Sequence, residues 1–441
     1  MQFSFATNDI DLISVAKKNS GTTLLGKTVL RHGTIVQIST VTTIETGNQI
    51  DEATPVFAYN LPDEILQMKE TIRRFVDREI IPLEGKSLDD RARLKPEIRS
   101  ALEARAKELG LWNITLPVEH GGYGMGVLAD AIVDEEMGRT VALPQRGGRI
   151  TGPEVRPSLY NLTGSMRERY LLPSISGEKR GCFAQTEPDA GSDPGAMRTT
   201  AVRDGDDYII NGEKHYINSA DEADFAIVLA ATDRKKGSHG GISAFIVDLD
   251  SPGVSLPTYY PIITGERLWK IVFDNVRVPA EKIILGEGMG FRLGQEALGA
   301  ARIRQAARAL GVADRCLELA ARYAKQRVTF GQALSERQAV QWMLVDPWIE
   351  LHFARLALYD AAARSDKGED VRVNAYMVKL FCTELAFRIS DRCMQIHGTA
   401  GFITDLPIPA LWHAARTYLI GEGSTEVMRM VLSRYLFRAY T

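Results

Sequence analysis

The hydrophobic and polar positions divide the chain into three successive regions with different periods. From about Leu61, apolar side chains return every three or four residues, which is the spacing of one face of an α-helix. The clearest stripe of this kind consists of Ile65, Met68, Ile72, Phe75 and Val76. Between about 181 and 285 the pattern changes to short runs rich in β-branched residues, and after Gly290 the helical period returns. The pattern therefore predicts helices, then strands, then helices.

Local signals place some of the element ends. Pro62 suits the start of the first helix, because the N–H that proline lacks has no partner in a first turn. Gly110 is typical of the end of a second helix over about 96–109. Within the strand-rich region, Asn211–Gly212 and Asp-rich stretches indicate tight turns, and Asn-Gly is a strong hairpin signal.

We therefore predict an α+β protein with three domains behind an N-terminal extension. The expected boundaries are 1–56 for the extension, 57–180 for a helical domain, 181–288 for a β-domain and 289–441 for a second helical domain. The extension lacks the pattern of a signal peptide, and its β-branched stretch over 24–46 is interpreted either as strands or as a weakly ordered appendage. We assign it no role.

Composition excludes some classes of protein. The chain is 45% hydrophobic and 25% charged, with a formal net charge of -3, so it has no basic surface excess for binding nucleic acid. No apolar run approaches the ~20 residues that cross a bilayer, so no membrane insertion is expected. Cysteines occur at 182, 316, 382 and 393 without a CxxC pair, and we interpret them as reduced core residues of a cytoplasmic protein. His215 and His397 are isolated, so no metal site is expected.

Two stretches have the residue types of a binding site. CFAQTEPDAGSD (182–193) turns through glycine, serine and aspartate, and such a turn exposes N–H and hydroxyl groups that suit phosphate and carbonyl oxygens. IGEGSTEVMR (420–429) places Glu422 between two glycines, ahead of a helical run in which Ser424 or Thr425 is a plausible N-cap and Glu426 lies in the first turn. Taken alone, these stretches fit an ordinary hairpin loop and an exposed loop glutamate equally well.

Three further stretches are HYINSAD (215–221), KQRVTFGQALSERQAVQ (325–341) and QIHGTAGF (395–402). The five stretches resemble motifs of the acyl-CoA dehydrogenase family and follow one another in the order found in that family. The resemblance covers about 57–441. The resemblance implies an N-terminal helical domain, a central antiparallel β-domain that is barrel- or sandwich-like, and a C-terminal four-helix bundle. It also implies FAD as the cofactor, an acyl-CoA substrate, and a homo-oligomer that is usually a tetramer.

The resemblance assigns FAD contacts to residues of the central region. In the first motif these are Phe183, Gln185, Thr186, Gly191 and Ser192, and Ser192 also lies near the thioester ligand. In the second motif they are Tyr216, Ile217 and Asn218, which match a family stretch that usually reads Trp-Ile-Thr. A phenol ring can still cover a flavin face and an amide can still donate a hydrogen bond, so flavin binding is expected with altered tuning at N5.

Further cofactor contacts are implied across a subunit interface. The residues concerned are Arg327, Phe330 and Gln338 in the third motif and Gln395, Ile396, Gly398 and Thr399 in the fourth. A guanidinium can bind a pyrophosphate through two parallel hydrogen bonds. Thr399 departs from the glycine that is common at its position. In the family these segments reach the FAD of a neighbouring subunit, so the resemblance predicts a site that needs two copies of the chain.

The resemblance assigns catalysis to Glu422 and further FAD contacts to Ser424, Thr425 and Glu426. Desaturation removes a proton from Cα of the acyl group, while the β-hydride goes to flavin N5. A carboxylate within hydrogen-bond reach can take this proton, and substrate binding shields it from water. Small neighbours, Gly421 and Gly423, let it approach the substrate closely.

Some members carry the base on the long helix, immediately before an arginine that matches Arg302; here Ala301 stands there, which favours Glu422. Arg302, Gly421, Gly423 and Ser192 are the expected substrate contacts. Gly421 replaces a common tyrosine, and the space predicts a branched, cyclic or bulky acyl group. Arg146 and Arg149 lie near where glutaryl-CoA dehydrogenases hold a distal carboxylate, but we interpret them as surface arginines.

Three hypotheses follow. The first is an acyl-CoA dehydrogenase that passes electrons to an electron-transferring flavoprotein. The second is a flavin-dependent oxidase on the same fold, whereas a monooxygenase would not need Glu422. The third is a non-catalytic CoA-ester-binding subunit, which purified protein without flavin colour would support.

Overall fold

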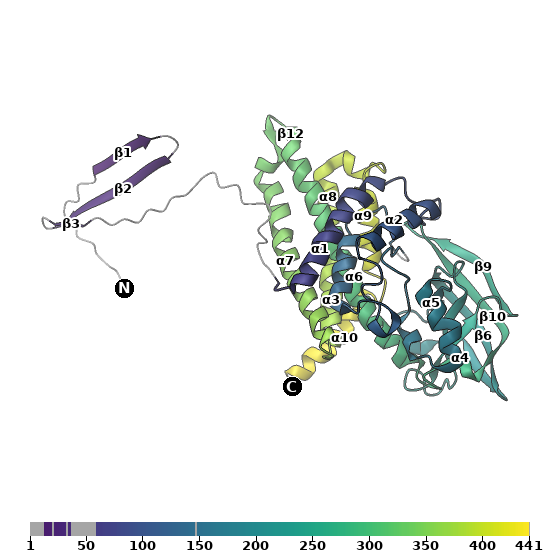
Figure 1. Ribbon diagram of the computed structural model, residues 1–441. Helices are drawn as coiled ribbons and strands as arrows, with labels where there is room; N and C mark the ends of the chain where they lie inside the picture. Colours follow the sequence, from purple (N-terminus) through teal and green to yellow (C-terminus); the bar gives the residue numbers. More distant parts are fainter. Residues whose placement is uncertain (1–12, 20–21, 32–33, 37–58, 146–147, 441) are drawn as a thin grey trace. The chain divides into compact units, whose positions relative to one another are not determined.

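The computed structural model describes residues 13–19, 22–31, 34–36, 59–145 and 148–440 (Figure 1). The chain divides into two units, Met1–Ala58 and Tyr59–Thr441. In the first unit, β1 (Ile13–Asn19), β2 (Thr22–Arg31) and β3 (Thr34–Val36) form an antiparallel sheet in that order. The strand interpretation of the extension therefore holds over the described part, and the remainder of the expected stretch, 32–33 and 37–46, lies outside the described residues.

The second unit begins with helices. The main ones are α1 (Asp63–Phe75), α2 (Pro96–Glu108) and α3 (Gly126–Met137). The shorter helical segments here are η1 (Val76–Ile80), η2 (Ile81–Leu83), η3 (Val118–His120), η4 (Pro157–Asn161), α4 (Gly164–Met166), η5 (Arg167–Leu171) and α5 (Leu172–Ser176). The predicted stripe is confirmed, since all five of its side chains are at most 7% exposed. Pro62 is the N-cap residue of α1, and Gly110 follows α2 with a φ of 70°.

The central region is one sheet of eight strands in the order β11-β8-β7-β5-β6-β10-β9, with β4 beside β7. Its strands are β4 (Gly181–Ala184), β5 (Thr200–Asp204), β6 (Asp207–Asn218), β7 (Phe225–Ala231), β8 (Ile242–Asp248), β9 (Val254–Pro261), β10 (Arg267–Pro279) and β11 (Ile283–Ile284). Most pairs are antiparallel, but β7 pairs in parallel with β4 and β5. The path of pairings has two open ends, so the expected closed barrel is not confirmed.

Both faces of the sheet are covered where β7 crosses it. Every side chain of β7 is buried. Because successive side chains of a strand point to opposite faces, Phe225 packs against Tyr170 on the face that also holds Leu293 of α6. Ala226 and Val228 lie in a second cluster on the other face, with Phe273 of β10. The sheet is thereby fixed to the start of the longest helix.

The predicted hairpin at Asn211–Gly212 is wrong. β6 runs straight through these residues, with Asn211 opposite Thr200 of β5 and Gly212 opposite Phe273 of β10. The turn lies instead at Gly205, in one of the Asp-rich stretches. Glycine is needed at 212 for close packing instead of a turn, because a Cβ there would lie 2.6 Å from the Cα of Thr199.

The C-terminal region is helical, as predicted. Its helices are α6 (Gly290–Gln326), α7 (Gln338–Asp366), α8 (Arg372–His397), α9 (Ile408–Tyr418) and α10 (Thr425–Ala439). A hairpin of β12 (Val328–Thr329) and β13 (Gln332–Ala333) joins α6 to α7, and the short segments of the chain from β4 onward are η6 (Pro194–Ala196), η7 (Ala280–Lys282), η8 (Leu334–Glu336) and η9 (Gly398–Phe402). Within the described residues this region has five α-helices, whereas the resemblance predicted a four-helix bundle. The last two, α9 and α10, flank a turn that contains Glu422.

One apolar core joins the two helical regions. Ile72 of α1 and Ile132 of α3 belong to the same buried cluster as Leu310 of α6, Leu358 of α7 and Leu385 of α8. The 37 residues of α6 correspond to about 55 Å at 1.5 Å per residue. In Figure 1 the hairpin labelled β12 lies at the opposite end of the helices from the central sheet. Within the described part of the chain, none of the helices has the length and apolarity needed to cross a membrane.

Candidate functional site

Glu422 lies on a strained turn between α9 and α10, residues 419–424, which we call the Glu422 turn. Its φ is 56°, in the left-handed region that side chains other than glycine rarely adopt, and the φ of Gly423 is 100°. Ser424 is the N-cap of α10, because its side chain accepts a hydrogen bond from the N–H of Val427 at 3.4 Å. Of the two predicted N-cap candidates, Ser424 is therefore the N-cap, and Thr425 is the first helical residue and is buried. Glu426 follows in the first turn, as predicted.

Two cationic side chains from different helices hold the main chain of the Glu422 turn. Nε of Arg302 on α6 donates to the main-chain oxygen of Glu422 at 3.2 Å, and Nζ of Lys379 on α8 donates to that of Gly423 at 2.6 Å. Arg302 also stacks on the ring of Tyr376, 4.4 Å from its centroid. Burial lowers the pKa of both groups, to about 8 for Lys379, and the charge of Glu422 opposes this shift in each. The turn is thus anchored to the two central helices.

Lys379 is not among the site residues predicted from the sequence, although the chain contains a signal for it. Lys379 is completely buried, on the same face of α8 as Ala375, Val378 and Cys382. A lysine on an apolar stripe is unusual, because an ammonium group loses its hydration there unless it is paired. Its position in that stripe therefore indicated a buried partner, but not that the partner would be the Glu422 turn.

The Glu422 side chain itself is exposed to solvent in the isolated chain, whereas Arg302 beside it is 6% exposed. Gly423 packs closely, because a Cβ at this position would lie 2.5 Å from Cε of Met428. Gly421 is half-buried and adds no side chain next to the carboxylate. The arrangement presents one carboxylate to an incoming molecule from a main chain that is fixed behind it.

The first sequence motif forms a supported loop at the end of β4. The main-chain oxygen of Thr186 accepts from the N–H of His215 at 2.8 Å, and that of Gln185 accepts from Nζ of Lys214 at 3.0 Å. Lys214 is completely buried and pairs with Glu187 at 2.7 Å. Burial lowers the pKa of Lys214 to about 8, although the Glu187 carboxylate partly opposes this. These bonds fix the base of the loop.

The tip of this loop presents polar groups. Gly191 and Ser192 are exposed, while Phe183, Gln185 and Thr186 are half-buried. A Cβ at Gly294 would lie 3.3 Å from Oε1 of Gln185, so the loop sits against the beginning of α6.

The second motif ends β6. Tyr216 has a φ of 60° and is 51% exposed, and its ring packs against that of Tyr260 with centroids 5.1 Å apart. Asn218 is half-buried and pairs with Leu268 of β10. Ile217, between Tyr216 and Asn218, points into the sheet core. His215 hydrogen-bonds Tyr260 through Nδ1 and Glu213 through Nε2, at 3.1 and 3.2 Å. This end of β6 offers an aromatic face and an amide to a ligand.

The third and fourth motifs meet at the opposite end of α6. Arg327 follows the last residue of α6, Phe330 in the hairpin is fully exposed with a φ of 50°, and Gln338 begins α7. The ring of Tyr323, one turn before Arg327, stacks on that of His397 with centroids 4.3 Å apart. This contact brings the third motif beside the end of α8, where Gln395, Gly398 and Thr399 are exposed and Ile396 is buried.

The motif residues therefore form two groups in one chain. From Gly294, which lies beside the first motif, to Arg327 the helix runs 33 residues, or about 50 Å at 1.5 Å per residue. One chain consequently does not bring the two groups onto a single cofactor molecule.

The group around β4 and β6 has the donor chemistry that a flavin requires. An isoalloxazine ring has carbonyl oxygens and ring nitrogens at its edge and an aromatic face. The hydroxyls of Thr186 and Ser192 and the amides of Gln185 and Asn218 can serve the edge, and Tyr216 can cover the face. We conclude that these residues fit the cofactor implied by the sequence motifs.

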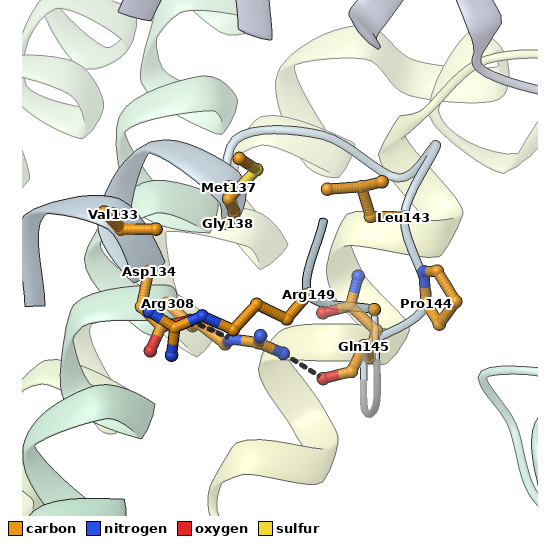
Figure 2. Close-up of a pocket in the computed structure, with 10 residues that line it drawn as sticks. Val133, Asp134, Met137, Gly138, Leu143, Pro144, Gln145, Arg149 and Arg308 are labelled. Atoms are coloured by element: carbon orange, nitrogen blue, oxygen red, sulfur yellow. Dashed lines mark hydrogen bonds and ion pairs between the residues drawn. The ribbon is translucent and has the colours of Figure 1, made fainter. Parts of the chain in front are cut away.

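A small cavity lies between α3, α6 and the segment that follows α3 (Figure 2). Its lining includes Asp134, Leu143, Pro144, Gln145, Arg149 and Arg308. Arg308 bridges the cavity, donating to Oδ1 of Asp134 at 2.9 Å and to the main-chain oxygen of Gln145 at 2.5 Å. The hydroxyl of Tyr418 donates to Oε1 of Gln145, which connects this wall to the helix that precedes the Glu422 turn.

Arg149 is not the surface arginine that the sequence suggested. Its side chain is 14% exposed and donates to Asp130 at 2.6 Å and to Thr115 at 2.9 Å. The carboxylate of Asp130 neutralises it. Burial alone would raise the pKa of Asp130, but the guanidinium groups of Arg149 and Arg304 hold it below its ordinary value. Arg146, the other arginine considered for a distal carboxylate, lies outside the described residues.

Three family models match successive parts of the chain. They are the N-terminal domain of acyl-CoA dehydrogenase over 62–178, the middle domain over 182–276 and the C-terminal domain over 288–437. Among the curated relatives, (R)-benzylsuccinyl-CoA dehydrogenase of Thauera aromatica is 35% identical over 392 residues, which cover 86% of this chain and 96% of that one.

Two further similarities agree with these matches. The 3-(aryl)acrylate reductase of Clostridium sporogenes is 36% identical over 376 residues, covering 84% of this chain and 98% of that one. The solved structure of butyryl-CoA dehydrogenase from Megasphaera elsdenii superposes with a TM-score of 0.76 at 30% identity, covering 86% of this chain and 100% of that one.

Proposed function

Because the chain belongs to the acyl-CoA dehydrogenase family, whose members are FAD-dependent, we propose that it desaturates an acyl-CoA thioester with Glu422 as the base. The reaction removes a proton from Cα and a hydride from Cβ, and leaves a double bond between the two carbons. The observation that carries the proposal is the Glu422 turn, an exposed carboxylate on a main chain held by Arg302 and Lys379.

The residues of the chain have separate tasks in this proposal. The carboxylate of Glu422 takes the α-proton, and Gly421 and Gly423 keep the space beside it open. FAD, when bound, accepts the hydride that leaves Cβ. The residues that would hold the flavin within the same chain are Phe183, Gln185, Thr186, Gly191, Ser192, Tyr216, Ile217, Asn218, Ser424, Thr425 and Glu426. Ser192 and Arg302 complete the expected substrate contacts.

A second copy of the chain completes the cofactor site in this proposal. The residues it would supply are Arg327, Phe330, Gln338, Gln395, Ile396, Gly398 and Thr399. The separation of about 50 Å along α6 supports this, because one chain leaves these residues far from the flavin loop. Exposed apolar side chains at helical spacing on α7, Trp342, Val345 and Ile349, are 42–58% exposed and suit an interface. We expect a homotetramer.

We propose a branched, cyclic or bulky acyl group as the substrate class. Gly421 takes the place of a tyrosine, so the carboxylate has an open side. Two relatives have names that specify benzyl or aryl groups. We further propose an electron-transferring flavoprotein as the acceptor and a cytoplasmic location, which accords with four cysteines that are all buried and free.

Anaerobic flavin bleaching tests the proposal. The purified protein is mixed with straight, branched, cyclic, aryl-substituted and dicarboxylic acyl-CoAs, and flavin absorbance is followed by stopped flow. We expect rapid bleaching by one class, and in Glu422→Gln a rate lower by about 10²–10⁴-fold with FAD content unchanged. Glu369→Gln, an exposed glutamate between α7 and α8, is the control and should leave the rate unaltered.

Other results would identify the alternatives. Fast reoxidation of the reduced flavin by oxygen would favour an oxidase. Protein that binds acyl-CoA but purifies without flavin would favour a non-catalytic subunit. Normal bleaching by Glu422→Gln would refute the assignment of the base.

A further inference from the structure

Lys379 is a buried cation for which the proposed chemistry has no task. Its side chain is 0% exposed, and its Nζ donates to the main-chain oxygen of Gly423 at 2.6 Å. A buried ammonium loses its hydration, and an apolar residue of similar volume commonly serves such a helix position at least as well for stability. The hydrogen bond from Lys379 to the Glu422 turn is therefore the feature that needs explaining.

We propose that Lys379 is a positioning residue that fixes the direction in which the Glu422 carboxylate projects. It acts together with Arg302, and the inference rests on the proposed role of Glu422 as the base. Lys379 touches neither the reacting atoms nor the flavin in this proposal, and it works only through the main chain of the turn.

The geometry of the two bonds carries this inference. Arg302 holds the oxygen of the peptide between Glu422 and Gly423, and Lys379 holds the oxygen of the next peptide. These two peptide planes meet at Cα of Gly423, so fixing both leaves little freedom for φ and ψ of Gly423, the residue next to the base. The left-handed φ of 56° at Glu422 is otherwise unfavourable for a glutamate, so the turn needs outside support to keep it. The two donors come from α6 and α8, which pack together in the core.

The charges around Lys379 suit this role. Glu422, Glu426 and Glu384 attract its ammonium group, and Arg302 repels it. Burial is the largest influence and lowers the pKa of Lys379 to about 8. The group therefore carries its charge at neutral pH and loses it in moderately alkaline solution. A misplaced base is costly, because a shift of about 1 Å in a catalytic group can reduce the rate by about 100-fold.

The test compares Lys379→Met with Thr383→Val in the FAD-loaded protein. Methionine keeps the length of the side chain and removes the donor. Thr383 is a matched control, because it is also fully buried on α8 and bonds only to main-chain oxygens of its own helix. Three quantities are measured: the rate of flavin reduction by the preferred acyl-CoA, the Kd of that acyl-CoA, and exchange of the substrate α-hydrogen with D2O by mass spectrometry.

We expect Lys379→Met to lower both the reduction rate and the α-hydrogen exchange by about 10–100-fold, with Kd within about threefold of wild type. Thr383→Val should match wild type in all three. Reduction and exchange by Lys379→Met within threefold of wild type would overturn the inference. That result is distinguishable from failure of the proposed function, in which wild type itself would show neither bleaching nor exchange, or Glu422→Gln would retain both.

A second variant decides the matter if Lys379→Met does not accumulate as folded protein. In wild type the reduction rate should decline as the pH rises through about 8, where Lys379 loses its charge. Lys379→Arg keeps its charge, so its decline should move to higher pH by more than one unit. The same alkaline decline in both proteins would show that it does not come from Lys379 and would contradict the inference.

Discussion

Nε of Arg302 lies 3.2 Å from the main-chain oxygen of Glu422, a residue 120 positions further along the chain. The contact joins α6 to the turn before α10, and the ring of Tyr376 on α8 stacks on the same guanidinium. A carboxylate on a glycine-flanked turn would otherwise move freely. The long helices of the core therefore decide where the proposed base stands.

Gly423→Ala should disturb this turn in two ways, through backbone strain and through crowding against Met428. The new Cβ would lie 2.5 Å from Cε of Met428, and a φ of 100° is unfavourable for alanine. We expect a loss of about 1–3 kcal/mol in the free energy of unfolding and a fall in flavin reduction of at least tenfold. Urea unfolding and stopped-flow reduction measure the two.

Gly368→Ala is the matched control for this substitution. Gly368 has a φ of 76°, and a Cβ there meets nothing within 4 Å. It should lose stability through backbone strain alone and keep the wild-type rate of reduction. Equal rates for the two variants would mean that crowding at Gly423 does not affect the base.

Gly421→Tyr should narrow substrate choice. The φ of Gly421 is not among the positive values in the described chain, so a tyrosine can adopt this backbone without strain of that kind. The new ring would fill the open side of the carboxylate. We expect kcat/KM for aryl-substituted or branched acyl-CoAs to fall at least tenfold relative to straight short chains. An unchanged ratio would remove Gly421 from the argument for a bulky substrate.

Arg327→Ala and Glu422→Gln should complement each other if the cofactor site spans two copies. Each variant alone is expected to be nearly inactive, Arg327→Ala because it loses FAD. In a mixed oligomer, one site combines the intact Glu422 of one copy with the intact Arg327 of the other. Co-expression with two different tags, followed by tandem purification, should therefore recover a fraction of the wild-type activity. No recovery in a confirmed mixed oligomer would indicate that both residues serve the same site from one chain.

Asp314→Asn should destabilise the helical core in a pH-dependent way. Burial alone would raise the pKa of Asp314, but the guanidinium groups of Arg355, Arg139 and Arg73 hold it well below its usual value. The charged pair is thus stronger in the folded chain, and the substitution should cost about 3 kcal/mol, the low end for a buried ion pair because the side chain is 25% exposed.

The sign of the pH effect follows from the lowered pKa. The stabilisation is complete above the unfolded pKa of about 3.9 and is lost as the pH falls below it. The difference in unfolding free energy between wild type and Asp314→Asn should be constant from pH 5 to 8 and shrink below about pH 4. Asp370→Asn, at an exposed ion pair with Arg372, should show little difference at any pH. A difference that grows as the pH falls would contradict this account.

Several features of the protein follow from the sequence alone, because they depend on neighbours in the chain. The period of the apolar residues gave the order of helices, strands and helices, and it placed Ile72 and Phe75 in the core. The serine before the last helix is its N-cap for the same local reason. Glu422 between two glycines was also evident from the sequence, since a short motif needs no fold to be seen.

Tertiary structure decided what depends on residues far apart. Asn211–Gly212 has the local preference for a hairpin, yet pairing with both β5 and β10 keeps β6 extended through it. Arginine is a residue type typical of the surface, but packing places Arg149 beside Asp130. Lys379 meets the Glu422 turn only because α8 packs beneath it. Periodicity determines which face of an element is buried, whereas the partner of a buried charge is determined only when the elements pack together.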